Sequence, residues 1–158
     1  MFLIPQSAYR IVSGGGKMRN DKGRSVFARQ DIPAGTVVGD YLGIVMHHDE
    51  ENEMRDGLYS MTCTPGYDVL PRPEDEGMHL LNHSCANNCD AFPYQGHMIV
   101  CAQRHIFAGE EMTISYALWC NETTQHPVSC VEHQCECGSR FCIGTMHAEP
   151  GIWESWDP

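Results

Sequence analysis

Three cysteines near the end of the chain are spaced for metal binding. Cys135, Cys137 and Cys142 fall within eight residues, so their thiolates can reach one ion. The chain has nine cysteines, and an odd, clustered set favours a metal site in a reducing compartment over a disulfide framework. A structural zinc ion takes four ligands in a tetrahedron, so a fourth ligand has to come from elsewhere. By chemistry alone the candidates are Cys85, Cys89, Cys120, Cys130, His126 and His133.

Two further segments carry side chains suited to chemistry. Residues 82–85 are Asn-His-Ser-Cys, and residues 109–116 are Gly-Glu-Glu-Met-Thr-Ile-Ser-Tyr. Alone, an Asn-His pair usually marks a turn, and a tyrosine at the end of a strand is more often a core residue. Their order, their spacing and the thiol-rich tail after them together resemble the SET-domain protein lysine methyltransferases. Residues 22–28, Lys-Gly-Arg-Ser-Val-Phe-Ala, resemble the Gly-x-Gly-Val-Phe-Ala segment of the same family.

The resemblance implies a site for S-adenosylmethionine. The positions matching family contacts to this cofactor are Lys22, Gly23, Arg24, Tyr59, Asn82 and His83. In and beside the segments assigned to the cofactor, three positions depart from the family pattern. Ser25 replaces the second glycine, Asn87 stands where the family has proline, and His79 stands where it has arginine. A serine at a position that needs a positive φ would be strained, so Ser25 is the departure with a structural consequence.

The resemblance also assigns catalytic and metal-binding roles. It places Tyr116 beside the site of transfer and Tyr41 in the lysine channel. It makes Cys85 the fourth zinc ligand, so one ion would tie the tail to the core. Ile114 matches the position that determines how many methyl groups are added. Because isoleucine has no hydroxyl to anchor a water and is smaller than an aromatic ring, di- or trimethylation is expected.

The chemistry of lysine methylation fits these residue types. The sulfonium methyl group is attacked in line by a neutral amine, whereas free lysine has a pKa of about 10.4. A poorly hydrated aromatic channel disfavours the ammonium form and aligns the nitrogen with the methyl carbon. The sequence shows no strong general base, and this scheme requires none.

Strand patterns dominate the chain. Apolar and β-branched runs bounded by turn residues predict strands at 9–12, 26–29, 36–41, 58–62, 97–102 and 110–116. Residues 28–41 and 102–116 look like copies of one unit, each with an Ala-Gly turn and a terminal tyrosine. One helix is predicted at 47–56, from Glu51 and Arg55 at i,i+4 spacing, and prolines predict an irregular segment at 63–78.

The predicted fold is therefore mainly β with few short helices. The alternative from the pattern alone is an unrelated small β-barrel. The resemblance implies a SET-domain fold of small sheets, a pseudoknot-like C-terminal crossing and a zinc-bound post-SET tail. Its expected parts are a SET domain at 6–120 with a variable insert at about 47–78, a linker at 121–134, the zinc segment at 135–147 and a tail at 148–158.

Charge and hydropathy limit the partners. Ten basic and 21 acidic residues give a formal net charge of −11, which argues against nucleic acid and favours a basic protein or peptide, plausibly a histone tail. No apolar run approaches the ~20 residues of a membrane span, so a soluble protein is expected. Its compartment would be the nucleus, or a host cell after secretion by a pathogen. The rival hypotheses are a SET fold without activity that serves as a binding module, and a small zinc-binding interaction domain without cofactor.

Overall fold

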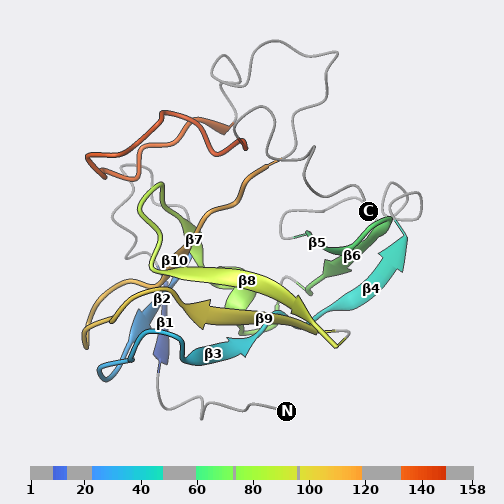
Figure 1. Ribbon diagram of the computed structural model, residues 1–158, viewed down its shortest axis with the longest axis horizontal. Helices are drawn as coiled ribbons and strands as arrows, with labels where there is room; N and C mark the ends of the chain where they lie inside the picture. Colours follow the sequence, from blue (N-terminus) through green and yellow to red (C-terminus); the bar gives the residue numbers. More distant parts are fainter. Residues whose placement is uncertain are drawn as a thin grey trace.

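The computed structural model describes residues 9–13, 23–47, 60–72, 74–95, 97–118 and 133–148. In this part of the chain nearly all regular structure is strand (Figure 1). The strands are β1 (Tyr9–Ser13), β2 (Arg24–Ala28), β3 (Val37–Asp40), β4 (Ile44–His47), β5 (Met61–Thr64), β6 (Tyr67–Leu70), β7 (Asn82–His83), β8 (Cys89–Tyr94), β9 (His97–Ala102) and β10 (Thr113–Ile114). The helical element among these residues is a 3-10 turn, η2 (Met78–Leu80). This confirms the predicted fold class.

The strands form four small sheets. Two are three-stranded, in the orders β3-β9-β8 and β4-β6-β5, and all their pairings are antiparallel. An antiparallel pair joins β1 to β2, and a parallel pair joins β7 to β10. The parallel pair brings the C-terminal motif beside Asn-His-Ser-Cys, and the Ser84 N–H donates to the Ile114 carbonyl at 3.0 Å. This pairing is the part of the predicted C-terminal crossing that the described residues show.

The two sequence copies pair with each other through equivalent backbone hydrogen bonds. Ile32 and Ile106, which are equivalent in the two copies, exchange backbone hydrogen bonds of 2.8 and 2.9 Å. The Ala28 N–H donates to the Glu110 carbonyl at 3.0 Å, and the equivalent Ala102 N–H donates to the Thr36 carbonyl at 2.9 Å. The repeat is therefore structural: each unit supplies the partner that the other unit's turn needs.

The core lies between the copies and η2. Its fully buried side chains include Val26 of β2, Val38 of β3, Val100 of β9, Met78 of η2, and Leu81, Ile106 and Met112 from the segments between strands. Complete burial of one such side chain stabilises the fold by about 1.5–3 kcal/mol. Packing of Met78 and Leu81 in the core thus holds the segment before β7 in place and positions the segments that follow.

Three details differ from the sequence predictions. Residues 63–78 are not irregular throughout, because Pro65-Gly66 forms the turn of a hairpin whose second strand, β6, is the central strand of its sheet. The predicted strand at 110–116 shortens to β10, because Met112 donates to Val26 of β2 while Thr113 and Ile114 pair with β7. His47 ends β4 and does not start a helix; the rest of that predicted helix, 48–56, lies outside the described residues.

Candidate active site and metal centre

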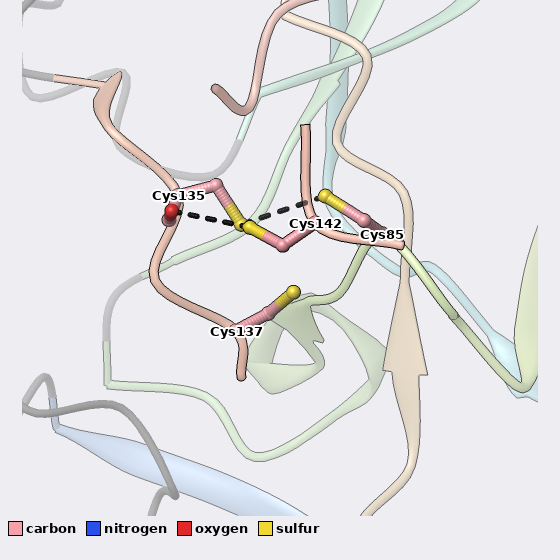
Figure 2. Close-up of side chains that lie close together, drawn as sticks. All are labelled: Cys85, Cys135, Cys137 and Cys142. Atoms are coloured by element: carbon pink, nitrogen blue, oxygen red, sulfur yellow. Dashed lines mark hydrogen bonds between the residues drawn. The ribbon is translucent and has the colours of Figure 1, made fainter. Parts of the chain in front are cut away.

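The clustered cysteines converge with Cys85, as the resemblance implies. Cys85 follows β7, whereas the other three come from the segment 133–148, and all four sulfur atoms lie within 4.8 Å of one another (Figure 2). The Sγ atoms of Cys85 and Cys135 are 3.6 Å apart. A tetrahedron with Zn–S bonds of about 2.3 Å has sulfur atoms about 3.8 Å apart. The donor set and its spacing therefore fit one zinc ion.

The thiols of this cluster differ in acidity. Burial raises the pKa of Cys85 and of Cys135. Burial acts in the same direction on Cys137, but hydrogen bonds from the backbone at Cys85 and Ser139 and from the side chains of Cys135 and Cys142 together outweigh it and lower the pKa of Cys137 to about 7. One thiolate is thus ready to bind a cation near neutral pH, and a bound divalent metal would deprotonate the others.

The other candidate ligands lie elsewhere or outside the described residues. Cys89 is fully buried in the core, where burial raises its pKa to about 12. The Nδ1 atom of His133 lies 3.1 Å from Nε2 of His147. Cys120, His126 and Cys130 lie outside the described residues.

Tyr116 is held beside β7 through its backbone and its side chain. Its hydroxyl donates to the Leu81 carbonyl at 3.0 Å, and its backbone N–H donates to Nδ1 of His83 at 3.1 Å. The two rings pack edge to face, with centroids 5.4 Å apart. Burial lowers the pKa of His83, so its imidazole is neutral near pH 7. The segment that the sequence singled out for cofactor binding thus also orients the predicted catalytic tyrosine.

Tyr41 contacts a residue of η2. Its side chain is buried in the core, and its ring meets the His79 ring edge to face at 6.4 Å. His79 occupies the position where the family pattern has arginine, and burial together with the charge of Arg24 lowers its pKa. His79, which contacts Tyr41, lies in η2, and Leu81, whose carbonyl accepts from the Tyr116 hydroxyl, directly follows η2. One short turn therefore connects the two tyrosines.

Ser25 causes no backbone strain. It lies in strand β2, it is 1% exposed, and it is not among the described non-glycine residues with positive φ. Its Oγ instead accepts a hydrogen bond of 2.8 Å from Nδ2 of Asn82, and the same nitrogen donates to Oε1 of Glu111 at 2.9 Å. The left-handed position is Gly23, with φ of 86°. The serine hydroxyl thus joins the two segments assigned to the cofactor, and the sequence analysis missed this role.

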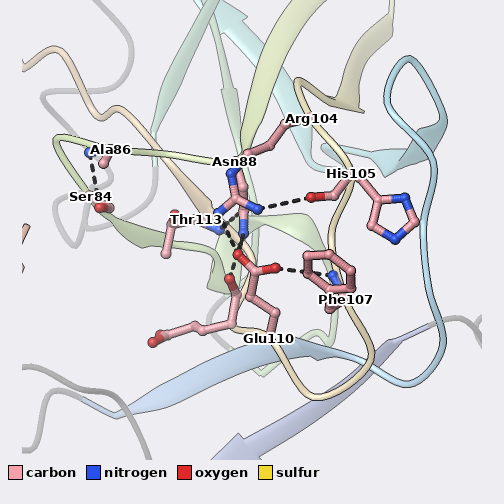
Figure 3. A network of polar contacts seen from close by, with 9 residues as sticks. Ser84, Ala86, Asn88, Arg104, His105, Phe107, Glu110 and Thr113 are labelled. Carbon is pink, nitrogen blue, oxygen red and sulfur yellow. Dashed lines mark hydrogen bonds and ion pairs between the residues drawn. The ribbon is translucent and has the colours of Figure 1, made fainter.

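The buried side chain of Asn88 organises a partly buried polar network that the sequence analysis also left without a role (Figure 3). Its Nδ2 donates to Oε1 of Glu110 at 3.2 Å and to the Glu111 carbonyl at 2.8 Å, and its Oδ1 accepts the Thr113 N–H at 2.9 Å. Glu110 also pairs with Arg104. Burial would raise the pKa of Glu110, but the bonds from Arg104, the Phe107 N–H and Asn88 hold it below its usual value. The network fixes the start of β10.

Asn88→Asp is expected to destabilise the protein by about 3 kcal/mol or more. The substitution keeps the shape of the side chain but removes both donated hydrogen bonds and places a carboxylate against Glu110. Urea unfolding measures the loss. The control is Asn87→Asp, because Asn87 is half-buried and donates one bond of 2.7 Å, to the Cys89 carbonyl, so about 1 kcal/mol is expected. Equal destabilisation by the two substitutions would contradict this role of Asn88.

Of the remaining predicted site residues, two lie in the described part of the chain and two lie outside it. Ile114 is buried in β10, opposite His83. Arg24 donates from Nη1 to the Asp75 carbonyl at 3.2 Å. Lys22 and Tyr59 lie outside the described residues. The structure therefore brings Asn82, His83 and Tyr116 together at β7 and gathers the four cysteines after it. Gly23 and Arg24 lie at the start of β2, whose next residue, Ser25, binds Asn82.

Comparison with known proteins identifies the family. The family model of the SET domain matches residues 23–117, over half of the chain, so the chain belongs to the SET domain family. It is 30% identical over 76% of its length to Histone-lysine N-methyltransferase 2B of Homo sapiens. It is 28% identical over 79% of its length to Histone-lysine N-methyltransferase, H3 lysine-36 specific, of Mycosarcoma maydis. The chain spans 5% and 13% of these two relatives. The unrelated β-barrel is thereby set aside.

Proposed function

We propose that the chain transfers methyl groups from S-adenosylmethionine to the side-chain amine of a protein lysine. The observation that carries this proposal is the placement of Tyr116, whose hydroxyl and whose Leu81 partner lie directly against the Asn-His-Ser-Cys segment. The bound cofactor would supply an activated methyl group on a sulfonium ion. Gly23, Arg24, Asn82 and His83 would hold it, and the 2.8 Å bond between Ser25 and Asn82 keeps those two segments together as such a site requires. Lys22 and Tyr59 are proposed to complete this site.

The chain's own residues would then prepare the amine. Tyr116 and Tyr41 would border the lysine, exclude water and so favour its neutral form. The hydroxyl of Tyr116 and the Leu81 carbonyl offer a fixed donor and acceptor for orienting the nitrogen. Because these groups are held in place before the reaction, they act mainly through position and electrostatics.

A basic segment of a protein is the proposed substrate class. The net charge of −11 attracts such a partner and repels nucleic acid. The relatives are named as histone-lysine methyltransferases, which supports a histone tail as target and the nucleus as compartment. No helix in the described residues is long and apolar enough to cross a membrane.

We also propose that the four cysteines hold one zinc ion. The proposed parts of the chain are a SET domain at 6–120, a linker at 121–134 and a zinc segment at 135–147.

Activity is tested by incubating the protein with labelled S-adenosylmethionine, a histone mixture and a peptide array. Mass spectrometry then locates the methylated lysine. Calorimetry with the cofactor runs in parallel, because a binding module without activity would bind cofactor without turnover. Turnover on a lysine peptide supports the enzyme, whereas cofactor binding without product on any peptide favours the binding module.

Ile114→Tyr is expected to shift the product from di- or trimethyl-lysine towards monomethyl-lysine. A tyrosine hydroxyl could hold the amine and a water, leaving no room for a methylated nitrogen to turn. Ile114→Phe is the matched control, because it adds the ring without the hydroxyl. Tyr94 does not fill this place, since it is 47% exposed at the end of β8. Product masses are followed over time. A wild type that stops at one methyl group would refute this role of Ile114.

A further inference from the structure

His83 has a buried ring with a polar neighbour at each nitrogen. The side chain is 4% exposed. Its Nδ1 accepts from the Tyr116 N–H at 3.1 Å, and its Nε2 lies 3.5 Å from the Sγ of Cys85. One side of the ring therefore faces the predicted catalytic tyrosine and the other faces a predicted zinc ligand.

The bond from Tyr116 determines which ring nitrogen carries the proton. A backbone N–H can only donate, so Nδ1 has to accept. In a neutral imidazole the proton is then on Nε2, which points at the sulfur of Cys85. A thiolate bound to a metal is a charged acceptor, and hydrogen bonds to charged acceptors are about twice as strong as neutral ones. Metal bound at the four thiols would therefore fix the position of this ring.

We propose that His83 is a positioning residue that couples the metal centre to Tyr116, donating from Nε2 to Cys85 and accepting at Nδ1 from the Tyr116 backbone. The proposal rests on the zinc ion of the proposed function. It assigns the His83 side chain to this coupling and leaves contact with the cofactor to the backbone. Any buried imidazole needs partners for its nitrogens, so this role is distinguished by what the partners are: the predicted catalytic tyrosine on one side and a predicted zinc ligand on the other.

The coupling reaches the reacting end of Tyr116 through a short path. The tyrosine is held at its N–H by His83 and at its hydroxyl by the Leu81 carbonyl. Removing the acceptor at Nδ1 leaves the N–H of Tyr116 without its partner, which is unfavourable where the group is buried. A shift of the backbone at Tyr116 then moves its hydroxyl away from the site of transfer.

Two substitutions separate the two contacts of His83, which are the Tyr116 arm (at Nδ1) and the Cys85 arm (at Nε2). In His83→Asn the amide oxygen replaces Nδ1 and keeps the Tyr116 arm, but the side chain does not reach Cys85. In His83→Gln the longer side chain places its amide nitrogen near Nε2 and keeps the Cys85 arm. Metal affinity is measured by chelator competition, and the sulfur-to-metal charge-transfer band is recorded with Co²⁺ in place of Zn²⁺.

His83→Asn is expected to bind metal about 10–100-fold more weakly, as for loss of a partner of a metal ligand. Its charge-transfer band should shift. His83→Gln should keep the metal affinity and the band of the wild type while its kcat falls with little change in KM, measured with metal-saturated protein. A His83→Asn protein with wild-type metal affinity and spectrum would overturn the coupling alone. A wild type that binds no metal would overturn both the coupling and the proposed zinc site.

The wild-type protein provides a test that does not depend on folding of the variants. Nitrogen-15 NMR of the protein loaded with cadmium-113 should show His83 protonated at Nε2, with a scalar coupling between that proton and the metal through the sulfur. Protonation at Nδ1 in the loaded protein would overturn the proposal.

Discussion

Tyr116→Phe should lower methyl transfer on the order of 100-fold or more while the protein stays folded, as for loss of one transition-state contact. The substitution removes one hydroxyl and keeps the ring, so the edge-to-face contact with His83 and the bond from the backbone N–H remain. The lost hydrogen bond to the Leu81 carbonyl is worth about 1 kcal/mol of stability. The effect on turnover should therefore far exceed the effect on stability.

Thermal melting, cofactor affinity and turnover are measured on one preparation. Cofactor affinity should survive, because Tyr116 is expected to act on the amine. Tyr94→Phe is the matched control, since it removes a hydroxyl from a solvent-exposed tyrosine and should leave turnover unchanged. Unchanged turnover in Tyr116→Phe would remove this residue from the catalytic role.

Local patterns predicted the elements that depend on neighbours in sequence. The strand at 97–102 is found with the same bounds, because its side chains alternate between exposed and buried faces and are β-branched or apolar at the centre. The three-cysteine spacing likewise placed three sulfur atoms together, since eight residues cannot carry them far apart. The equivalence of Ile32 and Ile106 was visible as a repeat, although their direct pairing was not.

Long-range contacts account for what the sequence did not reveal. Strand β6 was missed because prolines flank it and its four residues are too few to show a period. The role of Ser25 depends on Asn82, which is 57 positions away, so its substitution for glycine suggested strain where the fold provides a hydrogen bond. In the same way, His83 and Cys85 are neighbours in sequence, but the contact of His83 with Tyr116 spans 33 positions.

Cys135→Ser is expected to abolish stoichiometric zinc binding and, with it, most of the methyl transfer. Three ligands and a weak hydroxyl do not complete a tetrahedral thiolate site, and binding free energy at such a site is folding free energy for the segment it holds. In the described residues this segment is joined to the body by Cys85 and by bonds such as that from Leu118 to the Met146 carbonyl at 3.0 Å. Loss of the ion should therefore loosen residues 133–148 before the sheets.

Elemental analysis and limited proteolysis measure this outcome. The wild type should hold one zinc ion and resist cleavage in the segment 133–148, whereas Cys135→Ser should hold none and be cleaved there first. Cys101→Ser is the matched control, because Cys101 is a half-buried thiol of β9 outside the cluster and should keep both zinc and activity. Cys85→Ser should behave like Cys135→Ser, since Cys85 is the one ligand of the four that lies outside the segment 133–148. Full zinc content and activity in Cys85→Ser would show that the ion, if present, is held by another set of ligands.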